Sequence, residues 1–168
     1  NTAISLDPSF GKVYINKGTL LKNLQRYDEA LDEFNFGISL AKDKKNIAYK
    51  SQHIAYENRA DYYLELEDYE NALVDYNTAI KIEPTYLKVY GKRAELYLEL
   101  EDYENALIDY NHLVDNDPQN VQYLLDRSAC LSEMKKFDLA INDLNKVLRI
   151  DSLSDKAYYE RSTINWLD

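Results

Sequence analysis

Arginine and aspartate recur along this chain at a fixed interval, which indicates a pairing of charges. Two sets of residues repeat every 34 positions: Arg59, Arg93 and Arg127, and, 16 residues after each, Asp75, Asp109 and Asp143. A partly buried guanidinium needs an anion beside it. We therefore predict that each arginine pairs with an aspartate from its own or an adjacent copy of the repeating unit. The expected role of these pairs is structural rather than ligand binding.

Residues that could catalyse a reaction or hold a metal are scarce. The two histidines, His53 and His112, are 59 residues apart, and Cys130 is the single cysteine. The sequence contains no Gly-rich phosphate loop, no nucleophile elbow and no His-Glu-x-x-His motif. We therefore expect no catalysis, no metal site, no cofactor and no disulfide framework, and we expect a cytoplasmic protein.

The charge of the chain restricts its partners. It has 20 Lys and Arg against 30 Asp and Glu, a net charge of −10, and residues 53–118 alone hold five basic against sixteen acidic side chains. Such a surface repels phosphate backbones, so nucleic-acid binding is disfavoured and basic or neutral protein partners are favoured. No apolar run approaches the roughly 20 residues of a membrane-spanning helix, so membrane insertion is not expected.

The elements that must position these charges are helices. Four Gly and three Pro are too few for a many-stranded sheet protein. Residues 63–77, YLELEDYENALVDYN, return as residues 97–111 with 14 of 15 identical. In the later copy, Tyr90, Ala94 and Tyr97 follow the spacing of one helical face, and Tyr103, Ala106 and Tyr110 follow that of a second. The tyrosines are expected to be core residues, and the acidic pairs Glu67–Asp68 and Glu101–Asp102 to cap the second helices.

These residues resemble the tetratricopeptide repeat, a 34-residue helix–turn–helix unit. The shared positions in one unit are Tyr56, Ala60, Tyr63, Ala72, Tyr76, Ala79 and Pro84. The resemblance implies an all-α fold, a right-handed superhelical solenoid of antiparallel helix pairs. It divides the chain into residues 1–10 (the tail of a preceding repeat), repeats at 11–52, 53–86, 87–120 and 121–154, and residues 155–168 (the first helix of a following repeat). Because both ends fall within a unit, we expect a fragment of a longer array.

The first repeat is eight residues longer than the others, through an insertion near residues 43–50. The stretch contains no Gly or Pro, so nothing in it forces a long loop. We predict that the helices on either side are each longer by about a turn, with a short break near residues 43–46.

The resemblance also implies a peptide-binding groove lined mostly by the first helix of each repeat. Some members of the family grip the C-terminal carboxylate of a peptide with lysine and asparagine. Asn58, Lys88 and Lys92 match three elements of this carboxylate clamp, whereas Ile15 and Thr19 stand where its lysine and another asparagine are required. The clamp is therefore predicted to be partial.

Acidic residues fall at other groove positions of successive repeats, and these are Glu57, Asp61, Glu65, Glu95, Glu99 and Glu133. They either form an acidic ladder that recruits a basic peptide or helix, or form a solvated face that keeps the array soluble. Both interpretations stay open. With Asn16, Asn58, Lys88 and Lys92, the acids other than Glu57 make up the predicted groove.

The sequence therefore predicts a protein–protein interaction scaffold that binds a peptide or helical segment of a partner without catalysis. The alternative is a non-catalytic segment of a larger enzyme or co-chaperone, with a partial clamp for an acidic C-terminal peptide. The partner's identity and the oligomeric state are open.

Overall fold

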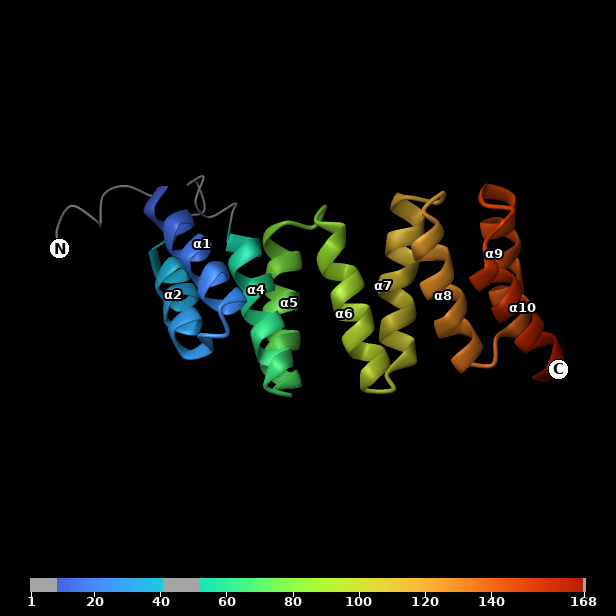
Figure 1. Cartoon of the computed structure of the whole chain (residues 1–168), viewed down its shortest axis with the longest axis horizontal. Helices are drawn as coiled ribbons and strands as arrows, with labels where there is room; N and C mark the ends of the chain where they lie inside the picture. Colours follow the sequence, from blue (N-terminus) through green and yellow to red (C-terminus); the bar gives the residue numbers. More distant parts are fainter. Residues whose placement is uncertain (1–8, 41–51, 168) are drawn as a thin grey trace. The chain divides into compact units, whose positions relative to one another are not determined.

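The computed structural model describes residues 9–40 and 52–167, and within them every regular element is an α-helix (Figure 1). In chain order the helices are α1 Ser9–Asn23, α2 Tyr27–Leu40, α4 Gln52–Glu65, α5 Tyr69–Ile82, α6 Leu87–Glu99, α7 Tyr103–Asn116, α8 Val121–Glu133, α9 Phe137–Ile150 and α10 Asp155–Leu167. The predicted lengthening and break around residues 43–50 lie outside the described residues.

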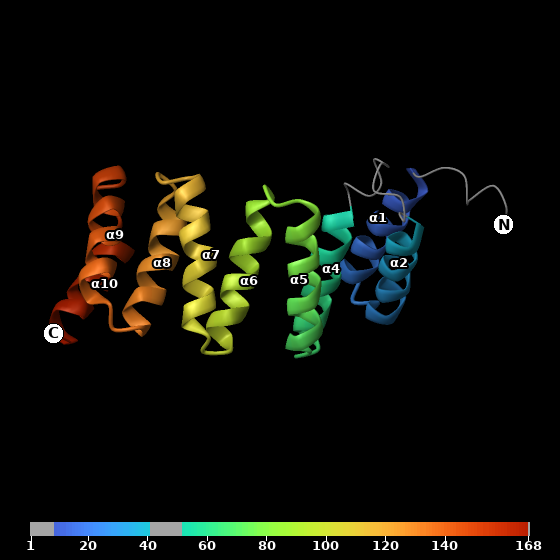
Figure 2. The same ribbon diagram turned by 180° about the vertical axis from the view of Figure 1, so that it is seen from behind.

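The helices pack as antiparallel neighbours within two compact units, one ending at Val89 and the other beginning at Tyr90. In the first unit, α1 packs on α2, α2 on α4, and α4 on α5. In the second unit, α7 packs on α8, α8 on α9, and α9 on α10. Figures 1 and 2 show the chain reversing direction at the short turns from α1 to α2, α4 to α5, α7 to α8, α8 to α9 and α9 to α10.

Side-chain caps and prolines fix the ends of the second helices. Asp68 accepts a hydrogen bond from the backbone N–H of Asn71 at the start of α5, and Asp102 accepts the same bond from Asn105 at the start of α7. These aspartates satisfy amide groups that have no partner inside the helix. Pro84 follows the residue that caps the end of α5, and a proline there prevents the helix from continuing. The predicted capping role therefore holds for the aspartate of each acidic pair.

The glutamate of each acidic pair has a different role. Glu67 and Glu101 have φ of 58° and 57°, in the left-handed region that favours glycine. The backbone N–H groups of Glu101 and Asp102 bond back to the carbonyls of Leu98 and Tyr97, which closes the end of α6. Gln25 and Lys135 adopt the same conformation after α1 and α8. Each turn between paired helices thus places a non-glycine residue in a conformation that costs free energy.

Replacing Glu101 with glycine should therefore stabilise the protein. Removing the left-handed strain should raise the free energy of unfolding by about 0.5–1 kcal/mol, after glycine's larger entropy in the unfolded chain is subtracted. Urea denaturation followed by circular dichroism measures this change. Glu104→Gly, which puts glycine in the first turn of α7, should lower stability instead. Equal effects of the two substitutions would contradict the assignment.

Small residues let the paired helices approach closely. Alanines on the facing sides are fully buried, among them Ala30, Ala60, Ala72, Ala79, Ala94, Ala106, Ala140 and Ala157. The large side chains Tyr76 and Tyr110 fill the space beside them and are at most 2% exposed. The tyrosines at these positions are packing residues, as the sequence predicts.

Candidate functional site

Each recurrent arginine forms a two-pronged bond to the aspartate 16 residues later. Arg59 Nε and Nη2 donate to Asp75 Oδ2 and Oδ1 at 2.6 and 2.7 Å. Arg93 bonds to Asp109 at 2.8 and 2.6 Å with the same atoms. Arg127 and Asp143 repeat this arrangement at 2.7 and 2.8 Å. The structure thus places each arginine against the second helix of its own repeat, with the aspartate side chains at most 3% exposed.

Tyrosines flank two of these guanidinium groups. Arg59 Cζ lies 5.3 Å from the ring centre of Tyr56 and 6.0 Å from that of Tyr63. These separations are within the range of cation–π attraction. Burial lowers the pKa of Arg59, but the hydrogen bonds and charge of Asp75 outweigh it, so the net pKa is raised. The group stays charged, which suits a structural ion pair.

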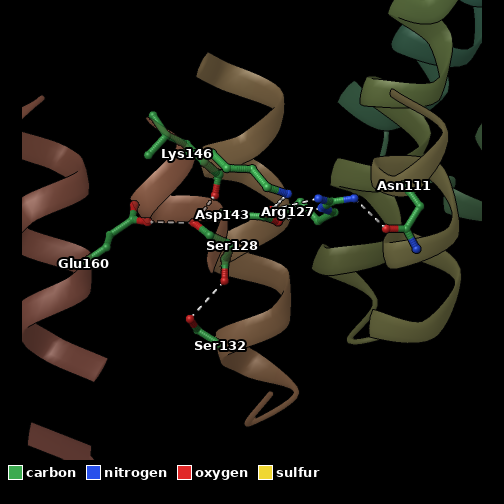
Figure 3. Close-up of polar contacts among 8 residues, drawn as sticks. Asn111, Arg127, Ser128, Ser132, Asp143, Lys146 and Glu160 are labelled. Atoms are coloured by element: carbon green, nitrogen blue, oxygen red, sulfur yellow. Dashed lines mark hydrogen bonds and ion pairs between the residues drawn. The ribbon is translucent and has the colours of Figure 1, made fainter. Parts of the chain in front are cut away.

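A second contact of the arginines links neighbouring repeats, and the sequence analysis missed it. Arg59 Nη1 donates to Asn35 Oδ1 at 2.5 Å, and Arg127 Nη1 donates to Asn111 Oδ1 at 3.0 Å. Figure 3 shows Arg127 between Asn111 and Asp143. Arg161 makes the same bond to Asn145 at 2.8 Å. The sequence does contain a signal for this contact, because asparagine recurs at the same position of every full repeat.

The residues that match the carboxylate clamp bond within the chain. Lys88 Nζ lies 2.8 Å from Glu57 Oε1, and Tyr86 Oη donates to Glu57 Oε2 at 2.8 Å. The Glu57 side chain is only 3% exposed. Asn58 Nδ2 donates to Thr19 Oγ1 at 3.2 Å. Lys88 is therefore occupied in compensating a buried acid of the predicted ladder.

Two further ladder acids also have partners in the first unit. Tyr76 Oη donates to Asp61 Oδ1 at 2.8 Å, and Lys22 Nζ lies 3.4 Å from Asp61 Oδ2. The same lysine lies 3.7 Å from Glu65. Sequence analysis placed no cation beside these acids, because Lys22 is 39 residues before Asp61 and comes from another repeat. Lys22 and Lys88 thus lie beside three of the predicted ladder acids.

The remaining predicted groove residues lie at or near the surface. Asn16 is exposed on α1, and Glu95 and Glu99 are exposed on α6. Lys92 is half-buried on α6, and Glu133 is exposed at the end of α8. Of this group, Glu133 lines a cavity.

That cavity is an open cleft of about 580 Å³ in the second unit, between α8 and α10. Its walls come from the first helices of two consecutive repeats, closed at one end by the start of α9. Its lining includes Ala129, Ser132, Glu133, Phe137, Glu160 and Ile164. Acidic, hydroxyl and apolar side chains therefore converge on one concave surface, as expected of a ligand site.

Family models of the tetratricopeptide repeat match residues 11–44, 53–86, 87–120 and 121–152. The chain belongs to the tetratricopeptide repeat family. The matched segments start at the four predicted repeat starts, and the fold is an all-α helical repeat solenoid.

Solved tetratricopeptide repeat structures resemble the chain in fold. One is YrrB, described as a protein with an unusual peptide-binding site, at a TM-score of 0.75 and 19% identity, covering 92% of this chain and 75% of that one. The first such domain of Spaghetti (RPAP3), bound to the HSP90 peptide SRMEEVD, has a TM-score of 0.63 and 19% identity, covering 70% and 94%. The second domain of human RPAP3, with the HSP70 peptide SGPTIEEVD, has a TM-score of 0.62 and 23% identity, covering 70% and 98%. No curated protein matches the chain.

The acid that faces across the cleft of this tetratricopeptide repeat protein is Glu160. Ser128 Oγ donates to Glu160 Oε2 at 3.1 Å, although the same hydroxyl also donates to the carbonyl of Leu125 at 2.7 Å (Figure 3). Lys156 Nζ lies 3.9 Å from Glu160 Oε1. Burial raises the pKa of Glu160 and outweighs these two contacts. Glu160 was not among the predicted groove residues, although it stands one repeat length after Asp126 on a groove-facing helix.

This carboxylate should cost stability at neutral pH. Because its pKa is higher in the folded chain than in the unfolded chain, the folded state binds more protons between the two values, so stability falls as pH rises. Glu160→Gln should therefore raise the free energy of unfolding at pH 7 by about 0.5–1 kcal/mol. The difference between the two proteins should shrink as pH falls through the raised pKa. Urea denaturation at a series of pH values measures the difference in the free energy of unfolding between Glu160→Gln and the original chain. A difference that does not change with pH would contradict the prediction.

The other reactive groups of the described residues offer no site. No cluster of metal-ligating side chains occurs in residues 9–40 or 52–167. Cys130 is buried, and burial raises the pKa of its thiol to about 11, so it remains a thiol at neutral pH. Over the same residues, no helix has the length and apolar character needed to cross a membrane.

Proposed function

We propose that the chain is a protein-interaction scaffold that binds a peptide or helical segment of a partner on the face formed by the first helices of its repeats. The observation that carries this proposal is the open cleft between α8 and α10. A concave surface with apolar walls and a few polar groups is the usual form of a binding site. The family supports this choice of face, because stacked repeats form an extended concave binding surface.

Binding without catalysis fits the chemistry of the cleft. Its polar lining consists of carboxylates, hydroxyls and one lysine, Lys135. The buried Cys130 does not line it. A carboxylate such as Glu160, which lines an open cleft and accepts a hydrogen bond from Ser128, is suited to recognition of a polar or cationic group.

A carboxylate clamp for a peptide such as SRMEEVD or SGPTIEEVD, the peptides in the two RPAP3 structures, is less well supported. In this chain Lys88 compensates the buried carboxylate of Glu57, and Asn58 bonds to Thr19. To take a peptide carboxylate, Lys88 would have to give up its 2.8 Å contact with the buried carboxylate of Glu57. The clamp is therefore not the function we propose.

Blocking the cleft should abolish peptide binding. Short random peptides displayed on phage would be selected on the full chain, and the enriched sequences synthesised for fluorescence anisotropy. Ala129 is exposed and lines the cleft, so Ala129→Trp should weaken their binding by about tenfold or more. Asn142→Trp, on the exposed face of α9, is the matched control and should leave binding unchanged. Peptides that bind both variants equally, or a selection that enriches nothing, would overturn the proposal.

A further inference from the structure

We infer that the cleft between α8 and α10 binds a lysine or arginine side chain of the partner segment, so that the partner is a basic peptide. This inference rests on the proposed function and names the chemistry of its ligand. It is carried by three features of the cleft: its position between two helices, its apolar wall, and a carboxylate whose nearest cation in the chain is 3.9 Å away.

The apolar wall suits the stem of a long cationic side chain. Phe137 at the start of α9 and Ile164 on α10 line the cleft, and Ile164 is 3% exposed. Lysine and arginine bury their methylene groups along such surfaces while the charged head reaches a polar group. The face of Phe137 also offers attraction to a cation. A neutral or acidic side chain of the same length would gain less from this combination.

The polar end of the cleft is anionic and incompletely satisfied. Glu160 is 22% exposed, and its neighbours are a hydroxyl whose proton is shared with the carbonyl of Leu125 and a lysine at 3.9 Å. Asp126 on α8 does not line the cleft, but its negative charge acts on Glu160, and its carboxylate accepts a hydrogen bond from Gln122 at 2.7 Å. Glu133 adds an exposed carboxylate to the α8 wall. A cation of the partner could therefore approach Glu160 more closely than Lys156 does.

One lysine of the chain opposes such a ligand. Lys135 lines the cleft from the exposed turn between α8 and α9. Its positive charge should repel a cation that enters the cleft. This residue provides a test of opposite sign, because removing its charge should strengthen the binding of a basic peptide and weaken that of an acidic one.

The experiment uses the peptides selected on the full chain. Each arginine in the strongest binder is replaced by citrulline, its neutral isostere, or each lysine by norleucine. One such replacement should weaken binding by about tenfold or more, as the loss of a charge-assisted hydrogen bond predicts. Glu160→Gln should weaken the unmodified peptide similarly, and Lys135→Gln should strengthen it. Asp115→Asn, which changes the same charge on the exposed face of α7, should have little effect.

The outcomes separate this inference from the proposed function. Two outcomes would overturn the inference of a basic side chain and leave the scaffold proposal standing. In one, the peptides that lose binding to Ala129→Trp contain no lysine or arginine. In the other, the peptides bind Glu160→Gln as tightly as the original chain. Peptides insensitive to Ala129→Trp would overturn the scaffold proposal itself. Equal weakening by Asp115→Asn and Glu160→Gln would show attraction by overall charge and would also overturn the inference.

Discussion

Replacing Arg93 with methionine is expected to lower the free energy of unfolding by about 3–5 kcal/mol. The substitution keeps an apolar stem but removes both hydrogen bonds to Asp109, whose side chain is 1% exposed. The carboxylate then stays buried without the cation of Arg93, so no Coulomb attraction from that cation offsets its desolvation penalty. Chemical denaturation of the full chain at pH 7, followed by circular dichroism, measures the loss.

Two further variants test the cause of that loss. Arg127→Met should be milder, because Lys146 Nζ remains 3.1 Å from Asp143 Oδ1. The double substitution Arg93→Met with Asp109→Leu should recover most of the stability, since it leaves no buried charge. Equal losses for Arg93→Met and for the double variant would show that the destabilisation comes from packing and not from the orphaned carboxylate.

Replacing Gly18 with alanine is expected to lower the free energy of unfolding by about 1–3 kcal/mol. A Cβ atom at this position would lie 2.6 Å from Cε1 of Phe34 and 3.2 Å from the carbonyl oxygen of Ala30. Phe34 is fully buried in a cluster with Leu21 and Ala30, so its ring has little room to move. The clash therefore exceeds the gain from removing a helical glycine.

The same substitution at Gly91 should have the opposite sign. Its added Cβ would meet Leu113 Cδ1 at 3.8 Å, which is ordinary contact. Gly91→Ala should therefore raise the free energy of unfolding by about 0.5–1 kcal/mol through better helix propensity. Thermal and urea denaturation of both variants decide the point. Stabilisation by Gly18→Ala would contradict the tight packing of Phe34 against Gly18.

Local sequence signals were sufficient for the repeats and their helices. These signals depend on neighbours close in the chain. They are the 34-residue period, the apolar spacing around Ala94 and Ala106, and the prolines at the ends of the repeats. Asp68 and Asp102 could be predicted as caps for the same reason. The left-handed conformation of Glu67 and Glu101 could not, because glutamate gives no composition signal for it.

The groove was harder to predict because its charges depend on other repeats. The ladder acids Glu57 and Asp61 meet Lys88 and Lys22, which come from neighbouring repeats in the first unit. Sequence spacing showed which face these acids share but not which lysines reach them. Glu160 became a candidate only when α10 was seen to face α8 across the cleft.

The sequence by itself indicated the family, the helix pairs and the pairing of arginine with a recurrent aspartate, because each follows from a period that repeats in the chain, whereas the structure placed that aspartate in the arginine's own repeat. Only the tertiary structure decided which charged side chains pair with other residues of the chain and which face an open cleft. Whether a carboxylate such as Glu57 or Glu160 is compensated depends on side chains brought close by helix packing, and the electrostatic free energy of a charge is set by those neighbours and by its burial.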